Sequence, residues 1–270
     1  MKENFMKIQN ARILLLLFTA CIATLATPTR SVAQTPPESP IFPNEEAEAI
    51  LKKACNTLRT KQAFTVDVDI TYDNVLDSGE KVQYSAFQQL WVKRPNQLKA
   101  DYTGDERHTS FYYDGKNFTL LAKKVNLYAT KPAPATIDAA IAAVEEKYDV
   151  TFPLANLFVS DPCKEIIPKI EKSKYIGFDM VNRVPSYHLL FTEEDKDFQV
   201  WIDDDDDEPE IQKIVITYKK LPGAPQYTAI LSNWNYKPQI PADTFNFRPP
   251  AGAGKIEFLP SEIRKLTPIK

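Results

Sequence analysis

The chain has 270 residues, 43% of them apolar and 26% charged, with 33 basic against 36 acidic side chains. This is the composition of a globular protein with one large or two small domains, and it excludes disorder and collagen. Seven glycines and two histidines leave little material for glycine-rich phosphate loops or for a zinc hydrolase site.

The N-terminal segment has the features of a secretory signal. Basic residues precede an apolar stretch from 13 to 26, and the small-x-small triplet Ser31-Val32-Ala33 follows. Signal peptidase cleaves after such a triplet, so we expect residues 1–33 to be a signal peptide. The apolar stretch is shorter than the roughly 20 residues that a membrane-spanning helix needs. The sequence therefore predicts an exported protein.

A second cleavage site competes with the first. Phe18-Thr19-Ala20-Cys21 resembles a bacterial lipobox with Phe where Leu is usual, and a lipid on Cys21 would anchor the protein to a membrane. Cleavage after residue 33 removes four basic and one acidic side chain, which changes the formal net charge from −3 to −6. An acidic protein without a basic stripe is a poor partner for nucleic acid.

The folded domain is expected to begin after a short linker. Residues 34–43 contain four prolines and are expected to form an extended, proline-rich linker. A single domain over 44–258 and a C-terminal tail over 259–270 are expected to follow. Asn44 is placed to cap a helix whose apolar residues recur at helical spacing as far as Leu58. A helix with one apolar face packs on a sheet.

Two cysteines remain after cleavage at residue 33. Cys55 is expected on the inner face of the first helix, and Cys163 lies far along the chain. In an oxidising compartment the two could form one disulfide, and the alternative is two separate buried thiols. The sequence leaves both open, because a disulfide needs Cα atoms within about 7 Å.

From residue 64 onward the pattern has a period of two. Phe64, Val66, Val68 and Ile70 alternate with polar residues, which predicts a strand with one buried face. Similar runs separated by turn residues predict an antiparallel meander. The expected strands span residues 64–71, 81–94, 97–102, 107–113, 117–122, 126–129, 174–180, 186–192, 198–202, 211–218 and 226–234.

Helices are expected in the middle of the chain. Thr136 is placed to cap a helix over 137–148, and Pro153 begins a shorter one over 154–159. Strand and helix do not alternate, so a parallel Rossmann or TIM arrangement is disfavoured. The predicted fold class is α+β, with one large, twisted antiparallel sheet and helices on one side.

No motif supports a catalytic or metal site. The acidic run 203–208 could bind calcium, but it lacks the EF-hand pattern, and a solvated hairpin loop is the preferred interpretation. His108 and His188 lack a nucleophile signature and are expected on strand surfaces. The paired carboxylates of a glycoside hydrolase would come from separate strands and have no signature here. We therefore assign no catalytic residue, no metal and no cofactor.

The aromatic residues give more information about function. The chain has 15 Phe, 12 Tyr and 3 Trp, and several strands are apolar on both faces. A sheet that is apolar on both sides needs two covers or a ligand. With few helices available, we expect a dry concavity that could hold an acyl chain or another lipid-like molecule.

Three segments of the chain resemble a known superfamily. They are the helix over 47–54 followed by the strand Phe64-Thr65-Val66-Asp67-Val68, the segment over 145–159, and the late segment over 245–253 that begins Phe245-Asn246-Phe247. Together with the meander they resemble the LolA/LolB-like periplasmic lipoprotein-carrier superfamily. The segment over 145–159 looks closest to an uncharacterised family of predicted periplasmic proteins within it.

The resemblance implies a fold, a location and a ligand class. The implied fold is an unclosed β-barrel, a strongly curved antiparallel sheet of about eleven strands whose concave face is covered by helices. The implied location is the periplasm, and the implied ligand is a lipid or a lipoprotein acyl chain. The lipoprotein-shuttle role is not carried over, because no residue matches the interior arginine of the carrier and Asn156 stands where the family helix is expected to have an aspartate.

The expected function is non-catalytic binding or carriage of a hydrophobic ligand. Peripheral contact of the protein with a membrane is compatible with this function. The alternative is an envelope interaction or sensor module that presents acidic residues to a basic partner protein, and an enzyme on the same scaffold ranks third. The one-residue register of the strands decides which face lines the cavity. The expected cavity wall consists of Phe64, Val66, Val68, Leu90, Val92, Tyr112, Phe118, Leu120, Ile141, Val144 and Leu157.

Overall fold

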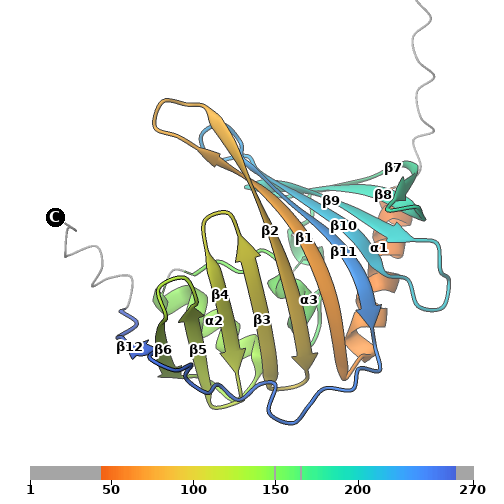
Figure 1. Cartoon of the computed structure of the whole chain (residues 1–270). Helices are drawn as coiled ribbons and strands as arrows, with labels where there is room; N and C mark the ends of the chain where they lie inside the picture. The colour runs from red at the N-terminus through yellow and green to blue at the C-terminus, as the bar shows by residue number, and fades with distance from the viewer. Residues whose placement is uncertain (1–43, 149, 165, 260–270) are drawn as a thin grey trace, which may run out of the picture. The chain divides into compact units, whose positions relative to one another are not determined.

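The computed structural model describes residues 44–148, 150–164 and 166–259. The chain divides into two units, 1–38 and 39–270, and all described residues belong to the second. The expected signal peptide with Cys21, the linker and residues 260–270 of the expected tail lie outside the described residues. Within the second unit, one twelve-stranded sheet carries helices on one of its faces (Figure 1).

The sheet is built from two antiparallel meanders that meet in the middle. The strand order is β12-β6-β5-β4-β3-β2-β1-β11-β10-β9-β8-β7, and the two ends of the sheet do not pair with each other. The first meander comprises β1 (Ala63–Val75), β2 (Lys81–Lys93), β3 (Gln97–Gly104), β4 (His108–Tyr113), β5 (Asn117–Ala122) and β6 (Leu127–Pro132). The second comprises β7 (Lys172–Val181), β8 (Val184–Thr192), β9 (Lys196–Asp203), β10 (Ile211–Tyr218) and β11 (Gln226–Asn235).

The sheet is strongly curved and remains an unclosed barrel (Figure 1). This confirms the expected fold class. Every strand proposed from the alternation is present, since alternation reports directly on one-sided burial. One further strand, β12 (Gly254–Lys255), pairs in parallel with β6 at Leu127 and Tyr128. A two-residue strand has no period, so the sequence pattern did not reveal it.

The helices cover the concave face of the sheet. The first, α1 (Asn44–Thr60), precedes the sheet, and α2 (Ile137–Tyr148), α3 (Ala155–Phe158) and the 3-10 turn η1 (Ile167–Lys169) lie in the connection between β6 and β7. Thr136 caps α2 as expected, because its hydroxyl accepts the backbone N–H of Ala139 at 3.3 Å. The expected helix over 154–159 is a single turn.

The strand register places the side chains on two faces. Phe64 of β1 stands opposite Val92 of β2, and Val66 stands opposite Leu90. All four side chains are buried. The intervening residues, such as Thr65 and Asp67, lie on the convex face. The concave face thus holds the main apolar core, which continues onto the inner sides of the helices.

Candidate functional site

One part of the concave face is tightly packed beneath α1. The apolar side of this helix consists of Ala47, Leu51, Ala54, Cys55 and Leu58, all buried, and the helix lies against β7 and β9. Beneath it the side chains of Leu189, Phe191 and Leu231 are fully buried. The site described next therefore lies elsewhere on the same face.

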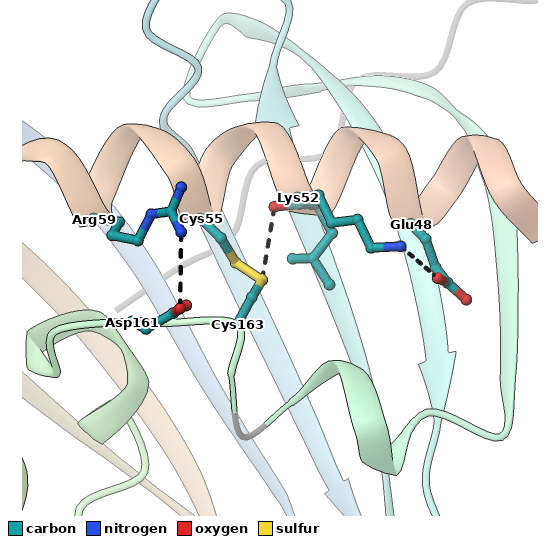
Figure 2. Close-up of a disulfide and its surroundings, with 7 residues drawn as sticks. Glu48, Lys52, Cys55, Arg59, Asp161 and Cys163 are labelled. Carbon is teal, nitrogen blue, oxygen red and sulfur yellow. Dashed lines mark hydrogen bonds and ion pairs between the residues drawn. A yellow bond between two sulfur atoms is a disulfide. The ribbon is translucent and has the colours of Figure 1, made fainter.

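A disulfide ties α1 to the connection that covers the other part of the face. Cys55 bonds to Cys163, with Cα atoms 5.7 Å apart and 108 residues between them in the sequence. Figure 2 shows the bond, with Arg59 of α1 beside Asp161 at 3.9 Å. Of the two alternatives left open by the sequence, the structure therefore shows the disulfide. It holds the segment after α3 against the packed part of the molecule.

The other part of the concave face holds a partly open cavity of about 690 Å³. Strands β1 to β5 and the β10–β11 turn form its wall, and α2, α3 and the segment between them form its cover. This volume lies within the range of about 300–1,000 Å³ found for small-molecule sites. Its apolar lining consists of Ala100, Phe111, Phe118, Leu120, Val144, Val150, Phe152, Pro153, Leu154, Phe158, Leu221, Pro225 and Phe258.

Aromatic contacts join the cover to the wall. The ring of Phe152 meets that of Phe111 edge to face, with centroids 5.4 Å apart. Phe118 contacts Tyr148 of α2 at 5.6 Å and Phe258 at 5.8 Å. Such pairs stabilise contact beyond the area they bury, by about 1 kcal/mol each. At one end of the cavity, the cover is therefore held in place by aromatic side chains that line the cavity or lie next to it.

A half-buried arginine fixes the position of α3. The guanidinium of Arg94 donates hydrogen bonds to the backbone carbonyls of Leu58 at 2.6 Å and Lys61 at 2.7 Å at the end of α1. It also donates to the carbonyls of Leu157 at 3.3 Å and Val159 at 2.7 Å. Burial lowers the pKa of Arg94, and the nearby Asp138 opposes that shift. Sequence analysis did not single out Arg94, because a single arginine before a proline carries no motif.

Polar side chains gather at the end of the cavity formed by the β3–β4 and β10–β11 turns. Arg107 precedes β4, and Tyr102 stands opposite Thr109 in the register of β3 and β4. Tyr72 stands opposite Tyr227 in the register of β1 and β11. All of these residues line the cavity. Tyr72 and Tyr102 could have been found from the sequence, since each continues the alternation of its strand by one step.

The structure distributes the expected wall residues over three places. Phe118, Leu120 and Val144 line the cavity. Tyr112 lies on the convex face, where its ring packs 5.4 Å from that of Phe247. The strand over 108–113 is apolar on both faces, so its pattern does not distinguish the two. The remaining expected residues are buried in the core beside the cavity: Phe64, Val66, Val68, Leu90, Val92, Ile141 and Leu157.

Both histidines lie in strands. His188 stacks on Trp201 with ring centroids 3.9 Å apart, and its Nε2 lies 2.8 Å from Oε1 of Gln199. His108 begins β4 and stands opposite Thr103. Their register places both on the convex face, away from the cavity.

The acidic run 203–208 forms the end of β9 and the turn that follows it. Part of its charge is paired within the chain, since Lys53 of α1 reaches Asp206 at 3.3 Å and Lys61 reaches Glu208. Within residues 44–148, 150–164 and 166–259, no group of three or more His, Cys, Asp and Glu side chains could hold a metal ion. None of the helices in those ranges is long and apolar enough to cross a membrane.

The family of the chain follows from a comparison with family models. The model described as "Predicted periplasmic protein (DUF2092)" matches residues 47–259. The chain belongs to the DUF2092 family. This membership confirms the resemblance noted for the segment over 145–159. The family's description also confirms the periplasmic localisation expected for this DUF2092 protein.

Solved structures with similar architecture share little sequence with this DUF2092 protein. An uncharacterized conserved protein from Thermus thermophilus is 6% identical, over 78% of this chain and 99% of that chain, with a TM-score of 0.46. LprF from Mycobacterium bovis is 14% identical over 78% and 99%, with a TM-score of 0.45. A LolA superfamily protein from Nitrosomonas europaea is 13% identical over 74% and 97%, with a TM-score of 0.37. No curated protein matches the chain.

Proposed function

We propose that the protein is an exported, non-catalytic binding or carrier protein that holds a hydrophobic ligand, a lipid or an acyl chain, in its concave cavity. The observation that carries the proposal is the cavity of about 690 Å³ between the sheet and the helical cover, with its mainly apolar lining. Burial of an alkyl chain there would contribute about 0.8 kcal/mol per methylene group. The periplasmic family supports the proposal, since a carrier between membranes works in that compartment.

The alternative, an interaction module that offers its acidic surface to a basic partner, has less support. That hypothesis relied on the acidic run 203–208, and two of its carboxylates are already paired with Lys53 and Lys61 of α1. Pairing within the chain reduces the charge available to a partner. The cavity has no such competing occupant among the described residues.

Titration with an uncharged fluorescent fatty alcohol tests the proposal. The delipidated protein should bind the probe saturably. Ala100 lines the cavity on β3, so Ala100→Trp should fill part of it with an apolar ring and weaken binding about tenfold, the effect of excluding about two methylene groups. Ala139 is exposed on α2, so Ala139→Trp is the matched control and should bind normally.

A second pair of variants places a charge in the cavity. Leu120→Asp puts a carboxylate on the cavity lining and should abolish binding, because the charge would have to be desolvated by the ligand. Val125 is exposed in the β5–β6 turn, so Val125→Asp is the control and should bind like the unsubstituted protein. Circular dichroism confirms folding of each variant. Failure of the unsubstituted protein to take up the probe would overturn the proposal.

A further inference from the structure

The two ends of the cavity differ in chemistry. One end, beneath α2 and the segment that follows it, is lined by Phe111, Phe118, Val144 and Phe152. The other end, at the β3–β4 and β10–β11 turns, is lined by Tyr72, Gln88, Tyr102, Arg107 and Tyr227. Tyr72 already donates its hydroxyl proton to Glu106, but an apolar molecule would offer no hydrogen-bond partner to Arg107 or to Tyr227, and covering unpartnered polar groups costs free energy. The lining therefore fits a ligand with an apolar and a polar end.

Arg107 supplies a positive charge at the polar end. Its side chain is exposed at the turn before β4, and its guanidinium lies 4.9 Å from the centroid of the Tyr102 ring. Among the described residues no carboxylate lies within ion-pair distance of this guanidinium. An arginine held over an aromatic ring keeps its forked set of N–H donors free for a carboxylate or a phosphate.

Asp73, which also lines the cavity, and Glu106 are occupied by other groups. Asp73 pairs with Lys81 at 3.7 Å and accepts the backbone N–H of Gln226 at 3.0 Å. Glu106 accepts the hydroxyl proton of Tyr72. Both carboxylates thus have partners other than Arg107, which leaves its guanidinium available to a ligand.

Tyr227 adds a hydrogen-bond donor on the same lining. Burial, followed by the neighbouring Tyr102, raises the pKa of Tyr227, while Arg107 acts in the opposite direction. The hydroxyl therefore stays protonated at neutral pH. It makes no hydrogen bond with any residue that the structure describes. Tyr227 is partly buried, and its free hydroxyl can donate to an acceptor on the ligand.

The volume of the cavity matches a ligand with one alkyl chain. A methylene group occupies about the same ~30 Å³ as a water molecule in the liquid. A cavity of about 690 Å³ therefore holds about twenty methylene-sized groups. That is room for one long alkyl chain and a small head group.

We infer that the ligand is an amphiphile with a single alkyl chain and an anionic head group, a carboxylate or a phosphate monoester, which pairs with Arg107 and accepts a hydrogen bond from Tyr227. This inference rests on the proposed function, because it assigns the head group of the same ligand. The chain lies against Phe111, Phe118 and the helical cover. The head group lies at the open turns, where it remains in contact with water.

Three probes with the same alkyl chain and fluorophore test the inference: a fatty acid, a fatty alcohol and a fatty amine. At pH 8 and low salt the acid should bind about fivefold more tightly than the alcohol, which corresponds to one solvent-exposed ion pair. The amine should bind most weakly. Competition by an alkyl phosphate and by an alkyl carboxylate of equal length then decides which anionic head group is preferred.

Variants of Arg107 locate the effect. Arg107→Gln should remove the preference for the acid and leave alcohol binding within about twofold, and Arg107→Lys should keep part of it. Tyr227→Phe should weaken binding of the acid about threefold, as expected for one hydrogen bond. Arg248 is exposed and outside the cavity lining, so Arg248→Gln is the matched control and should change nothing.

The outcomes separate the inference from the proposed function. If none of the three probes binds, the proposed function itself fails. If the alcohol binds and the acid binds no better, or if Arg107→Gln leaves the preference intact, the cavity remains a binding site and the anionic head group is overturned. Tighter binding of the amine overturns it as well.

Discussion

The two parts of the concave face differ in how they are covered. Beneath α1, Leu189 and Leu231 are fully buried, and the apolar side of a continuous helix of 17 residues covers them. Beneath α2 and α3 the cover consists of a helix of 12 residues, an irregular segment and a helix of four. The first cover packs against the sheet, and the second leaves a cavity of about 690 Å³.

The strands themselves do not account for this difference. Most strands of both parts alternate apolar and polar residues, with β4 as an exception, and both parts present large apolar side chains to the concave face. Protein interiors are close-packed wherever the cover permits. The cavity therefore depends on the path of the cover, and changes to the cover or to its attachment should affect the two parts unequally.

Loss of the disulfide should have the largest effect on stability. The bond closes a loop with a sequence separation of 108 residues, and a loop of this length contributes about 4 kcal/mol by restricting the unfolded chain. Cys55→Ala/Cys163→Ala should therefore reduce the free energy of unfolding by about 4 kcal/mol in urea denaturation. A reducing agent should destabilise the unsubstituted protein and leave the double variant unchanged. Equal urea midpoints for the double variant and the unsubstituted protein would contradict this attachment of the cover to α1.

Truncation of one leucine in each part should measure how tightly that part is packed. Leu231→Ala, in the packed part, should cost about 3 kcal/mol because it leaves a void in a fully buried position. Leu120→Ala should cost about 1 kcal/mol, since Leu120 is only partly buried and already borders the cavity. Urea denaturation of the two variants measures both values. Similar losses would mean that the two parts are packed equally well.

A smaller effect is expected at the end of the packed part, where Glu210 precedes β10. Burial, and then the charge of Asp203, raise the pKa of Glu210 to about 7. A carboxyl group with a raised pKa binds its proton more strongly in the folded state, so stability should fall as the pH rises from about 4.5 to about 7. The loss should be about 1 kcal/mol, since the group is only half-buried.

Glu210→Gln tests the pH effect. The variant should be more stable than the unsubstituted protein at pH 8 and should lose this difference below about pH 4.5, where the carboxyl becomes protonated in both states. Thermal unfolding at the two pH values measures it. Glu45 is exposed on α1, so Glu45→Gln is the control. It should change the thermal unfolding temperature by the same amount at both pH values. A constant difference across the pH range would exclude Glu210 as the cause.

The sheet could be predicted from the sequence because its signal is local. Alternation over β1 reports directly that one face is buried, and the same holds for the other long strands. The strand β12 was missed because its position is set by tertiary contacts. The side chain of Asn126 donates to the carbonyl of Ala251 at 3.2 Å, and the backbone N–H of Gly254 donates to the carbonyl of Asn126 at 3.0 Å.

The lining of the cavity could be predicted only in part, because it depends on contacts between distant segments. Alternation placed Val66 and Leu90 on the concave face, but it could not reveal that other core residues would cover them. In β4 both faces are apolar, and Phe247, far along the chain, covers Tyr112 on the convex side. The polar end was missed since Arg107 precedes β4 and Tyr227 lies on β11, with three strands between them in the sheet, so no local pattern connects the two residues.

The bond between Cys55 and Cys163 also determines the compartment in which folding can be completed. Such bonds are rare in the reducing cytosol and form in oxidising compartments. The segment beyond α3 is therefore fastened only after the polypeptide has left its site of synthesis, and cargo from the cytosol cannot be enclosed in the finished molecule. Recombinant material for biochemical work should accordingly be secreted or refolded with an oxidant.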